Sequence, residues 1–379
     1  MTDDSDNVKQ VSGFCSWCLQ YGTHVRVKRH LISRNHYQCQ HCGRDTVRCR
    51  LCENLAKRQG DENDGLCAEH DGSIERFRDP TQRINTLEDI PLLFAGRSLK
   101  QRVTSVVQAD TRSWRKLQTR IGEQLEAGTA PDSSVMRPLV DQVAERLGGL
   151  RLYTLREGDE PAIILANGFL SQSEKDYDDW LDGVAQRFPH NKIYGVGWAS
   201  QRKSYLLTDL LRSVSPGNLR RPQLGRTLAA SGERWERALL SANWSGLLLA
   251  NAIARCDSNE RYILMGHSLG ARLMFHTLAW LAADDRPRIQ DVYLLGGAVG
   301  AADPLWPRAV AGLEGTLYNL LSQHDQVLSR LYKACSSDGA AIGVQRIEHP
   351  RVVNFDASRL VKKHTGYKPH LARLLTTMG

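Results

Sequence analysis

Short runs of apolar residues recur along the second half of the chain, and a longer amphipathic stretch separates each run from the next. Continuous apolar runs bounded by turn residues are typical of strands buried on both faces, and amphipathic stretches are typical of the helices that cover them. The pattern therefore predicts an α/β fold with a mostly parallel sheet and helices on both faces. The predicted strands span residues 152–155, 162–166, 193–198, 261–265, 292–295, 317–321 and 352–355.

Two helices are predicted ahead of this alternation. Apolar residues between 98 and 125 recur at helical spacings, and a Gly-Thr-Ala-Pro-Asp segment at 128–132 ends the pattern. A second helix is predicted over 136–147, where two glycines close it. We interpret residues 80–149 as a helical connector, with a lid or a prefix packed on the main sheet as the alternatives. Residues 201–237 carry many arginines and two prolines, and they are equally compatible with a cap over a substrate site and a plain surface insertion.

Cysteines concentrate near the N-terminus. The chain has nine, and seven of them lie between residues 15 and 67 in Cys-x-x-Cys spacings. In a chain with no visible export signal, such spacings favour metal binding over disulfides. Four pairs of ligands fill two tetrahedral zinc sites. The predicted ligands are Cys15, Cys18, Cys39, Cys42, Cys49, Cys52, Cys67 and His70.

The pairing of these ligands is open. A sequential arrangement joins the first two pairs and then the last two, whereas an interleaved one joins first with third and second with fourth. Residues 38–43 have the form of a zinc-ribbon knuckle, which favours the sequential arrangement. Sites closed by four protein ligands are structural, so we expect two Zn²⁺ ions that stabilise the module and no cofactor for catalysis. Unligated thiols and a redox-active pair are the alternatives.

The charge of the chain and its first residues bear on its partners and its location. The formal net charge is +8, residues 26–50 carry many basic side chains, and Trp17, Tyr21 and Tyr37 supply aromatic rings of the kind that stack on bases. This composition is compatible with a nucleic-acid partner, a protein partner or a solvated surface. The first residues are acidic and polar, so no secretory signal is predicted. No apolar run reaches the roughly 18 residues of a membrane-spanning helix, so we expect no transmembrane segment and a cytoplasmic location.

The segment Gly266-His267-Ser268-Leu269-Gly270 lies between a predicted strand and a predicted helix. In that context Gly-x-Ser-x-Gly forms a tight turn that presents the serine hydroxyl as a nucleophile, as in α/β hydrolases. The hydroxyl needs a base to take its proton. The alternative interpretation is a structural glycine turn with an ordinary serine.

In α/β hydrolases an acid and then a histidine follow the nucleophile along the chain, each after a later strand. Asp325 follows the strand at 317–321, and His364 follows the strand at 352–355, so these two residues complete the predicted triad. Asp303 is the rival acid and His370 the rival base. Asp325 is also compatible with a helix N-cap.

The tetrahedral intermediate of acyl transfer needs backbone N–H donors for its oxyanion. Leu269 directly follows the nucleophile, and Phe169 lies in the loop after the strand at 162–166. The N–H groups of these two residues are the predicted donors.

Further motifs accompany the serine motif in a fixed order. They are Asn167-Gly168-Phe169-Leu170, Gly195-Val196-Gly197-Trp198, Leu294-Leu295-Gly296-Gly297-Ala298-Val299, Tyr318-Asn319, Asp325-Gln326-Val327-Leu328 and Asn354-Phe355-Asp356. Together the set resembles the family of transmembrane and coiled-coil domain hydrolases, long catalogued as a domain of unknown function, over roughly residues 150–370. The resemblance implies a lipase- or phospholipase-like enzyme with Ser268, Asp325 and His364 as its triad.

The chain is thus expected to contain a disordered tail at 1–10, a two-zinc Cys/His module at 11–75, the connector at 80–149 and an α/β-hydrolase catalytic domain at 150–379. The expected function is hydrolysis of a carboxylic ester, in a lipid or a soluble substrate, through an acyl-enzyme on Ser268. Thioesters and amides are the runner-up substrates. The alternative from another class is an interaction protein, in which the zinc module binds nucleic acid or protein and the hydrolase domain is auxiliary or inactive.

Overall fold

The structure is a computed structural model of the chain. It describes residues 10–28, 35–49, 54–58, 65–68, 83–90, 93, 111–147, 149–168, 177–198, 224–284, 288–333, 336 and 339–378. The predicted tail, except Gln10, lies outside the described residues, as do the first part of the helix predicted from residue 98 and the segment 201–223.

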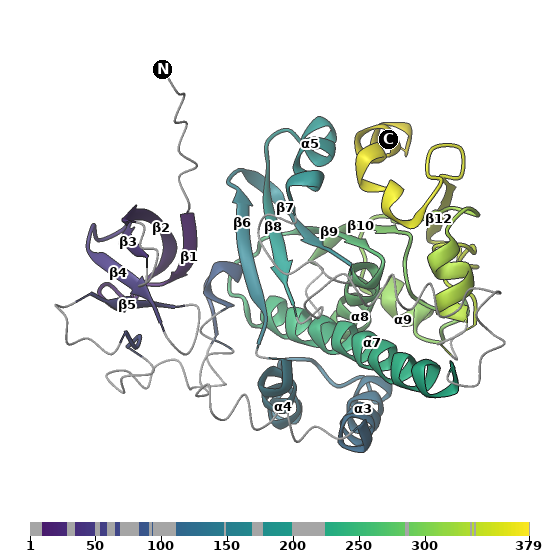
Figure 1. Cartoon of the computed structure of the whole chain (residues 1–379), viewed down its shortest axis with the longest axis horizontal. Helices are drawn as coiled ribbons and strands as arrows, with labels where there is room; N and C mark the ends of the chain where they lie inside the picture. The colour runs from purple at the N-terminus through teal and green to yellow at the C-terminus, as the bar shows by residue number, and fades with distance from the viewer. Residues whose placement is uncertain are drawn as a thin grey trace.

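Seven strands form one sheet in the C-terminal part of the chain, in the order β12-β11-β10-β9-β7-β8-β6 (Figure 1). Neighbouring strands run parallel except at one edge, where β6 is antiparallel to β8. The strands are β6 (Arg151–Arg156), β7 (Asp159–Ala166), β8 (Asn191–Gly197), β9 (Tyr262–His267), β10 (Ile289–Leu295), β11 (Leu317–Leu321) and β12 (Val352–Asp356). The predicted α/β fold with a mostly parallel sheet is confirmed.

The strand order creates a switch point between β7 and β9. The chain passes from β7 outward to β8, and it then returns to the other side of β7 to form β9. The loops that leave β7 and β9 therefore diverge, which opens the place where α/β sheets bind their ligands, at the carboxyl ends of the strands. Gly168 follows β7 and Ser268 follows β9, so the topology brings the two motifs together.

Helices cover both faces of the sheet because successive strand residues point to opposite sides. On β7, Ile164 belongs to the apolar cluster under α7 (Leu224–Arg255) and α8 (Leu269–Leu281). Its neighbour Ile163 belongs to the cluster under α5 (Asp178–Arg187) and α11 (Leu371–Met378). Both faces of the sheet are thus buried, as continuous apolar strands predict. Shorter helical segments also follow the strands, namely α9 (Trp306–Ala311), η4 (Val327–Tyr332), η5 (His364–Gly366) and η6 (Lys368–His370).

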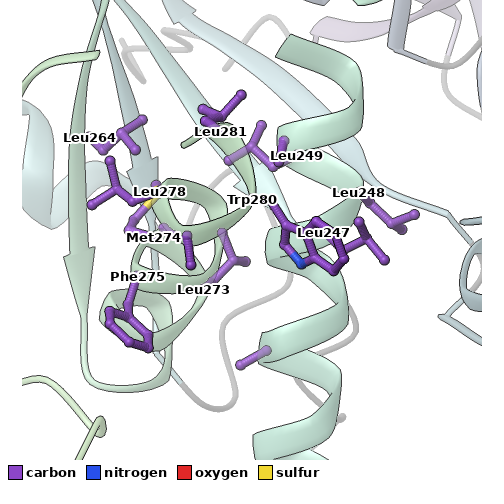
Figure 2. Packing of buried hydrophobic residues seen from close by; sticks show 14 of the residues in the cluster. Leu247, Leu248, Leu249, Leu264, Leu273, Met274, Phe275, Leu278, Trp280 and Leu281 are labelled. Carbon is purple, nitrogen blue, oxygen red and sulfur yellow. The ribbon is translucent and has the colours of Figure 1, made fainter. Parts of the chain in front are cut away.

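The helix that follows Ser268 is buried along its whole length between α7 and the sheet (Figure 2). Leu247, Leu248 and Leu249 of α7 belong to the same apolar cluster as Leu273 and Trp280 of α8. Gly246 allows the close approach, because a Cβ there would lie 2.6 Å from the Leu273 carbonyl oxygen. A buried leucine side chain contributes about 1.5–3 kcal/mol, so this layer holds the turn at Ser268 from behind.

The segment between the N-terminal module and the sheet packs into the same core. Ile84 N–H donates to the Arg255 carbonyl at 3.1 Å, and Asp257 N–H donates to the Ile84 carbonyl at 2.8 Å. Leu87, in the short helix η2 (Leu87–Asp89), is fully buried. The helices α3 (Thr111–Glu126) and α4 (Arg137–Leu147) lie beneath α7 in Figure 1, and their apolar residues join its cluster. The described residues of the predicted connector, from Ile84 to Val143, therefore contribute to the core of the sheet domain.

Five short strands form a separate antiparallel sheet at the N-terminus (Figure 1). They are β1 (Gln10–Phe14), β2 (Tyr21–Lys28), β3 (His36–Cys39), β4 (Asp45–Arg48) and β5 (Leu55–Lys57). The sheet closes on itself, because Ser16 N–H donates to the Leu55 carbonyl at 2.9 Å and joins the end of β1 to β5. Among the described residues of this module, the apolar cluster consists of Val11, Tyr37 and Leu55.

One element boundary and one sheet differ from the sequence prediction. The helix predicted at 136–147 is present as α4, but residues 224–237 are helical rather than irregular and form the first part of α7. The last proline of that segment is Pro222, so nothing beyond it prevents a regular helix. The strands of the N-terminal module were not predicted, because four of them have only three to five residues and β2, the longest, has no continuous apolar run.

Candidate active site

Ser268 occupies a strained backbone position between β9 and α8. Its φ is +58° and its ψ is −118°, a combination that residues with side chains rarely adopt. Backbone hydrogen bonds on both sides hold it there. Ser268 N–H donates to the Leu295 carbonyl at 3.0 Å, and the Ser268 carbonyl accepts from the N–H groups of Ala271 and Ala298, each at 3.1 Å. The turn is therefore fixed by α8 and by the loop after β10.

Three glycines make room for this turn. A Cβ at Gly266 would lie 2.5 Å from the Gly270 carbonyl oxygen, and a Cβ at Gly270 would lie 2.1 Å from the Ala166 carbonyl oxygen. A Cβ at Gly168 would lie 2.9 Å from the Ser268 Cβ. These distances are shorter than real Cβ contacts, so the glycines of the motif are required by close backbone approach.

The side chains of Ser268, His364 and Asp325 form one hydrogen-bonded chain. His364 Nε2 lies 2.8 Å from Ser268 Oγ, and His364 Nδ1 lies 2.6 Å from Asp325 Oδ2. Because a carboxylate can only accept, Nδ1 carries the ring proton and Nε2 is left to accept from the serine hydroxyl. All three residues are buried, although they come from three loops more than 35 residues apart. The structure thus brings together the three residues of the predicted triad.

Asp325 makes two contacts with its two carboxylate oxygens. Oδ2 binds His364, while Oδ1 accepts from the Leu328 N–H at 3.1 Å at the start of η4. The two interpretations of this residue, triad acid and helix cap, therefore describe the same side chain. The cap bond fixes the carboxylate so that its second oxygen is directed at the imidazole.

The rival residues have other contacts. The Asp303 carboxylate accepts from the Leu305 N–H at 2.9 Å, just before α9. His370 is half-buried in η6, beyond the loop that carries His364. The hydrogen bonds to Ser268 and Asp325 are made by His364.

The two predicted oxyanion donors are the N–H groups of Leu269 and Phe169. Leu269 is the first residue of α8, and the first N–H groups of a helix have no acceptor within it. This N–H lies beside Ser268 at the positive end of the helix dipole. Phe169 lies outside the described residues. Its neighbour Asn167 is held by two indoles, since Trp180 Nε1 donates to its Oδ1 at 2.7 Å and Trp198 Nε1 to its carbonyl at 3.1 Å.

One contributing residue was missed by the sequence reasoning. Arg272 is buried one turn into α8, where it donates to Asn243 Oδ1 at 2.6 Å and to the Ala298 carbonyl at 3.2 Å. Ala298 is the residue whose N–H binds the Ser268 carbonyl. The spacing of four residues from Ser268 was the available signal, because it places Arg272 on the same helix face as the nucleophile.

The N-terminal module brings four of the predicted metal ligands together. The thiols of Cys15, Cys18, Cys39 and Cys42 lie within 4.8 Å of one another. Cys15 Sγ is 3.8 Å from Cys42 Sγ, and Cys18 Sγ is 3.9 Å from Cys39 Sγ. Four sulfurs at about 2.3 Å around a tetrahedral zinc ion lie about 3.8 Å apart, so these residues fit such an ion. The first two pairs converge, as in the sequential arrangement.

The electrostatics of the cluster depend on a cation. Burial raises the pKa of the Cys15 thiol, which keeps it neutral in the absence of metal. A bound cation has the opposite effect on a thiol and deprotonates it.

Half of the second predicted ligand set is described. Cys67 N–H donates to Cys49 Sγ at 3.3 Å, which places these two residues together. Cys52 and His70 lie outside the described residues.

A seven-stranded sheet in this order, with the serine on the turn after β9, is the α/β-hydrolase fold. Residues 222–379 match the family described as "Protein of unknown function (DUF726)". A transmembrane and coiled-coil domain-containing protein of Oryza sativa subsp. japonica is 26% identical over 253 residues, which cover 60% of this chain and 38% of that protein.

Other proteins are also similar to this chain. An uncharacterized membrane protein of Schizosaccharomyces pombe is 30% identical over 149 residues, which cover 38% of this chain and 19% of that protein. The chain thus spans less than two fifths of the length of these relatives. Among solved structures, α/β-hydrolase domain-containing protein 10 from mouse covers 60% of this chain and 91% of its own, with 15% identity and a TM-score of 0.33. No helix within the described ranges is both long and apolar enough to span a bilayer.

Proposed function

We propose that this protein is a serine hydrolase that cleaves a carboxylic ester through an acyl-enzyme on Ser268. The observation that carries the proposal is the chain of hydrogen bonds from Ser268 Oγ through the His364 ring to Asp325, at 2.8 and 2.6 Å. A serine with a strained backbone, a histidine with its second nitrogen free to accept, and a buried carboxylate are the parts of an activated nucleophile.

The reaction follows from these positions. His364 Nε2 takes the proton of the Ser268 hydroxyl as Oγ attacks the substrate carbonyl carbon. The developing negative charge on the carbonyl oxygen is stabilised by the Leu269 N–H at the start of α8, with Phe169 N–H as the second proposed donor. His364 then gives its proton to the departing alkoxide, which leaves as an alcohol. Water attacks the acyl-enzyme in the same way and releases the acid and the free serine.

Asp325 acts through His364. Its carboxylate accepts from Nδ1–H, which selects the tautomer whose Nε2 can accept from Ser268 and stabilises the imidazolium that forms during attack. The cap bond from Leu328 N–H prevents the carboxylate from rotating away. We therefore assign nucleophile, base and acid to Ser268, His364 and Asp325.

The proposed substrate class is a carboxylic ester, with thioesters and amides as the runner-up. Two similar proteins are named as membrane proteins, which favours an ester of a lipid over a small soluble ester. Lipid esters and soluble esters share the same reacting group, so the length of the acyl chain distinguishes them.

We further propose that Cys15, Cys18, Cys39 and Cys42 bind one structural Zn²⁺ and that Cys49, Cys52, Cys67 and His70 bind a second. The fit of the first set to a tetrahedron supports the first ion, and the contact between Cys67 and Cys49 supports the second. With four protein ligands each, these sites leave no position for a substrate. They stabilise the module and take no part in ester cleavage.

The test of the proposed function is ester hydrolysis by the full chain over p-nitrophenyl esters of rising acyl length. We expect turnover that disappears in Ser268→Ala, with the highest kcat/KM for medium or long acyl chains. A preference for the shortest ester would contradict a lipid substrate, but the assignment as a hydrolase would stand. Equal turnover by wild type and Ser268→Ala would contradict the hydrolase.

A further inference from the structure

His267 is a buried histidine that the proposed reaction does not use. It is the last residue of β9 and directly precedes Ser268. Its Nε2 lies 2.9 Å from the backbone carbonyl oxygen of His364, 97 residues further along the chain. Its ring also lies against the ring of His364, with the two ring centres 4.9 Å apart.

The direction of this hydrogen bond follows from its partner. A backbone carbonyl only accepts, so Nε2 of His267 carries a proton and donates it. Burial, together with the neighbouring His364 and Lys368, lowers the pKa of His267 well below its ordinary value. His267 is therefore neutral at physiological pH, with its single ring proton committed to the His364 carbonyl.

Two consecutive residues thus hold His364 at two different points. His267 binds its backbone carbonyl, and Ser268 binds its ring at Nε2. Asp325 holds the ring at Nδ1. The residues just before His364 form a loop between β12 and η5 with exposed side chains at Lys362 and Lys363, so the bond from His267 ties that loop to the nucleophile turn.

We infer that His267 is a positioning residue, which fixes the distance between the nucleophile turn and the general base by donating to the His364 backbone carbonyl. This inference rests on the proposed function. A displacement of about 1 Å in reacting groups costs on the order of 100-fold in rate, so loss of this bond reduces the chemical step more than substrate binding.

The test compares variants of the full chain by ester kinetics and by the rate of labelling with a fluorophosphonate. His267→Phe keeps a ring but removes the donor, and we expect kcat and the labelling rate to fall about 10- to 100-fold with KM within about twofold. His267→Gln places an amide N–H near the position of Nε2 and is expected to retain most of the wild-type rate. His267→Asn places its donor short of the carbonyl and is expected to behave like His267→Phe.

The matched control is His276, which is also fully buried, on α8, and has its pKa lowered by burial. His276→Phe is expected to label at the wild-type rate. Thermal denaturation shows whether each variant is folded. If His267→Phe is not folded, the comparison of His267→Gln with His267→Asn replaces it.

The outcomes separate this inference from the proposed function. If wild type is labelled at Ser268 and His267→Phe is labelled equally fast, His267 has no positioning role and the proposed function stands. The same conclusion follows if His267→Asn is labelled as fast as His267→Gln. If wild type is not labelled at Ser268, the proposed function fails, and the positioning role fails with it. If His267→Phe and His267→Gln are labelled equally slowly, the ring of His267 contributes by packing and not by its hydrogen bond, which would contradict the inference.

Discussion

The two ends of the molecule hold reactive side chains in opposite ways. In the N-terminal module, four thiols converge on one point, and the apolar cluster of the described residues has three members. In the sheet domain, Ser268, His364 and Asp325 are held at the edge of two large apolar clusters. A small module with little core needs an ion to fold, whereas a large core can support a strained nucleophile without one. If both proposals hold, buried reactive side chains serve stability in the module and chemistry in the sheet domain.

Removal of metal is expected to have the largest effect and to divide the two regions. Structural zinc contributes roughly 10–16 kcal/mol of apparent binding free energy in small domains, so chelation should unfold the module. Hydrogen exchange of residues 10–68 should rise to that of an unfolded chain, while β7 and β9 stay protected. Cys39→Ser should lower the zinc content by one ion per chain, and Cys256→Ser, outside the module, should leave it unchanged. If hydrogen exchange in the module did not change after chelation, the module would not depend on metal for its fold, and the two regions would not differ in this respect.

Asp325→Asn is expected to lower kcat by about 10⁴-fold, because an amide that donates to Nδ1 favours the wrong tautomer of His364. Zinc content should not change. Asp303→Asn is the matched control, and we expect kcat within about twofold of wild type. A large fall for Asp303→Asn with little change for Asp325→Asn would reverse the assignment of the acid.

Gly270→Ala probes how tightly the sheet domain is packed behind the nucleophile. The added Cβ would lie 2.1 Å from the Ala166 carbonyl oxygen, so we expect a loss of about 1–3 kcal/mol in the free energy of unfolding. Gly122→Ala is the control, since a Cβ there meets nothing within 4 Å and lies inside α3. It should stabilise by about 0.5–1 kcal/mol. Equal effects of both substitutions on denaturant unfolding would contradict the close approach at Gly270.

The smallest expected effect concerns pH. Burial raises the pKa of Glu260, at the end of the sheet domain away from Ser268. The folded state therefore binds the proton of Glu260 more tightly than the unfolded state, and its ionisation costs stability as the pH rises through the raised pKa. Glu260→Gln should raise the free energy of unfolding at pH 8 by less than about 1 kcal/mol after solvent screening, and the Tm with it, but should change neither at pH 4. The module should respond in the opposite direction, because acid protonates its thiolates and releases metal. A higher Tm for Glu260→Gln at pH 4 alone would contradict the sign.

Sequence patterns could predict the sheet domain because its strands contain continuous apolar runs and its motifs follow strand ends. The order of Ser268, Asp325 and His364 along the chain sufficed to propose residues that the fold places within hydrogen-bonding distance. The strands of the module could not be predicted in this way. They have three to eight residues and show neither a continuous apolar run nor a clear alternation of apolar and polar residues. The second role of Asp325 as a cap, and the contact of His267 with a backbone carbonyl, depend on tertiary geometry that no local pattern records.

The central claim is that Ser268 is an activated nucleophile. Its most direct test is reaction of the full chain with a fluorophosphonate, followed by mass spectrometry of the intact protein and of its peptides. The account predicts one covalent adduct per chain on the peptide that contains Ser268, and none in Ser268→Ala. An adduct on another residue, or equal modification of the Ser268→Ala variant, would contradict it.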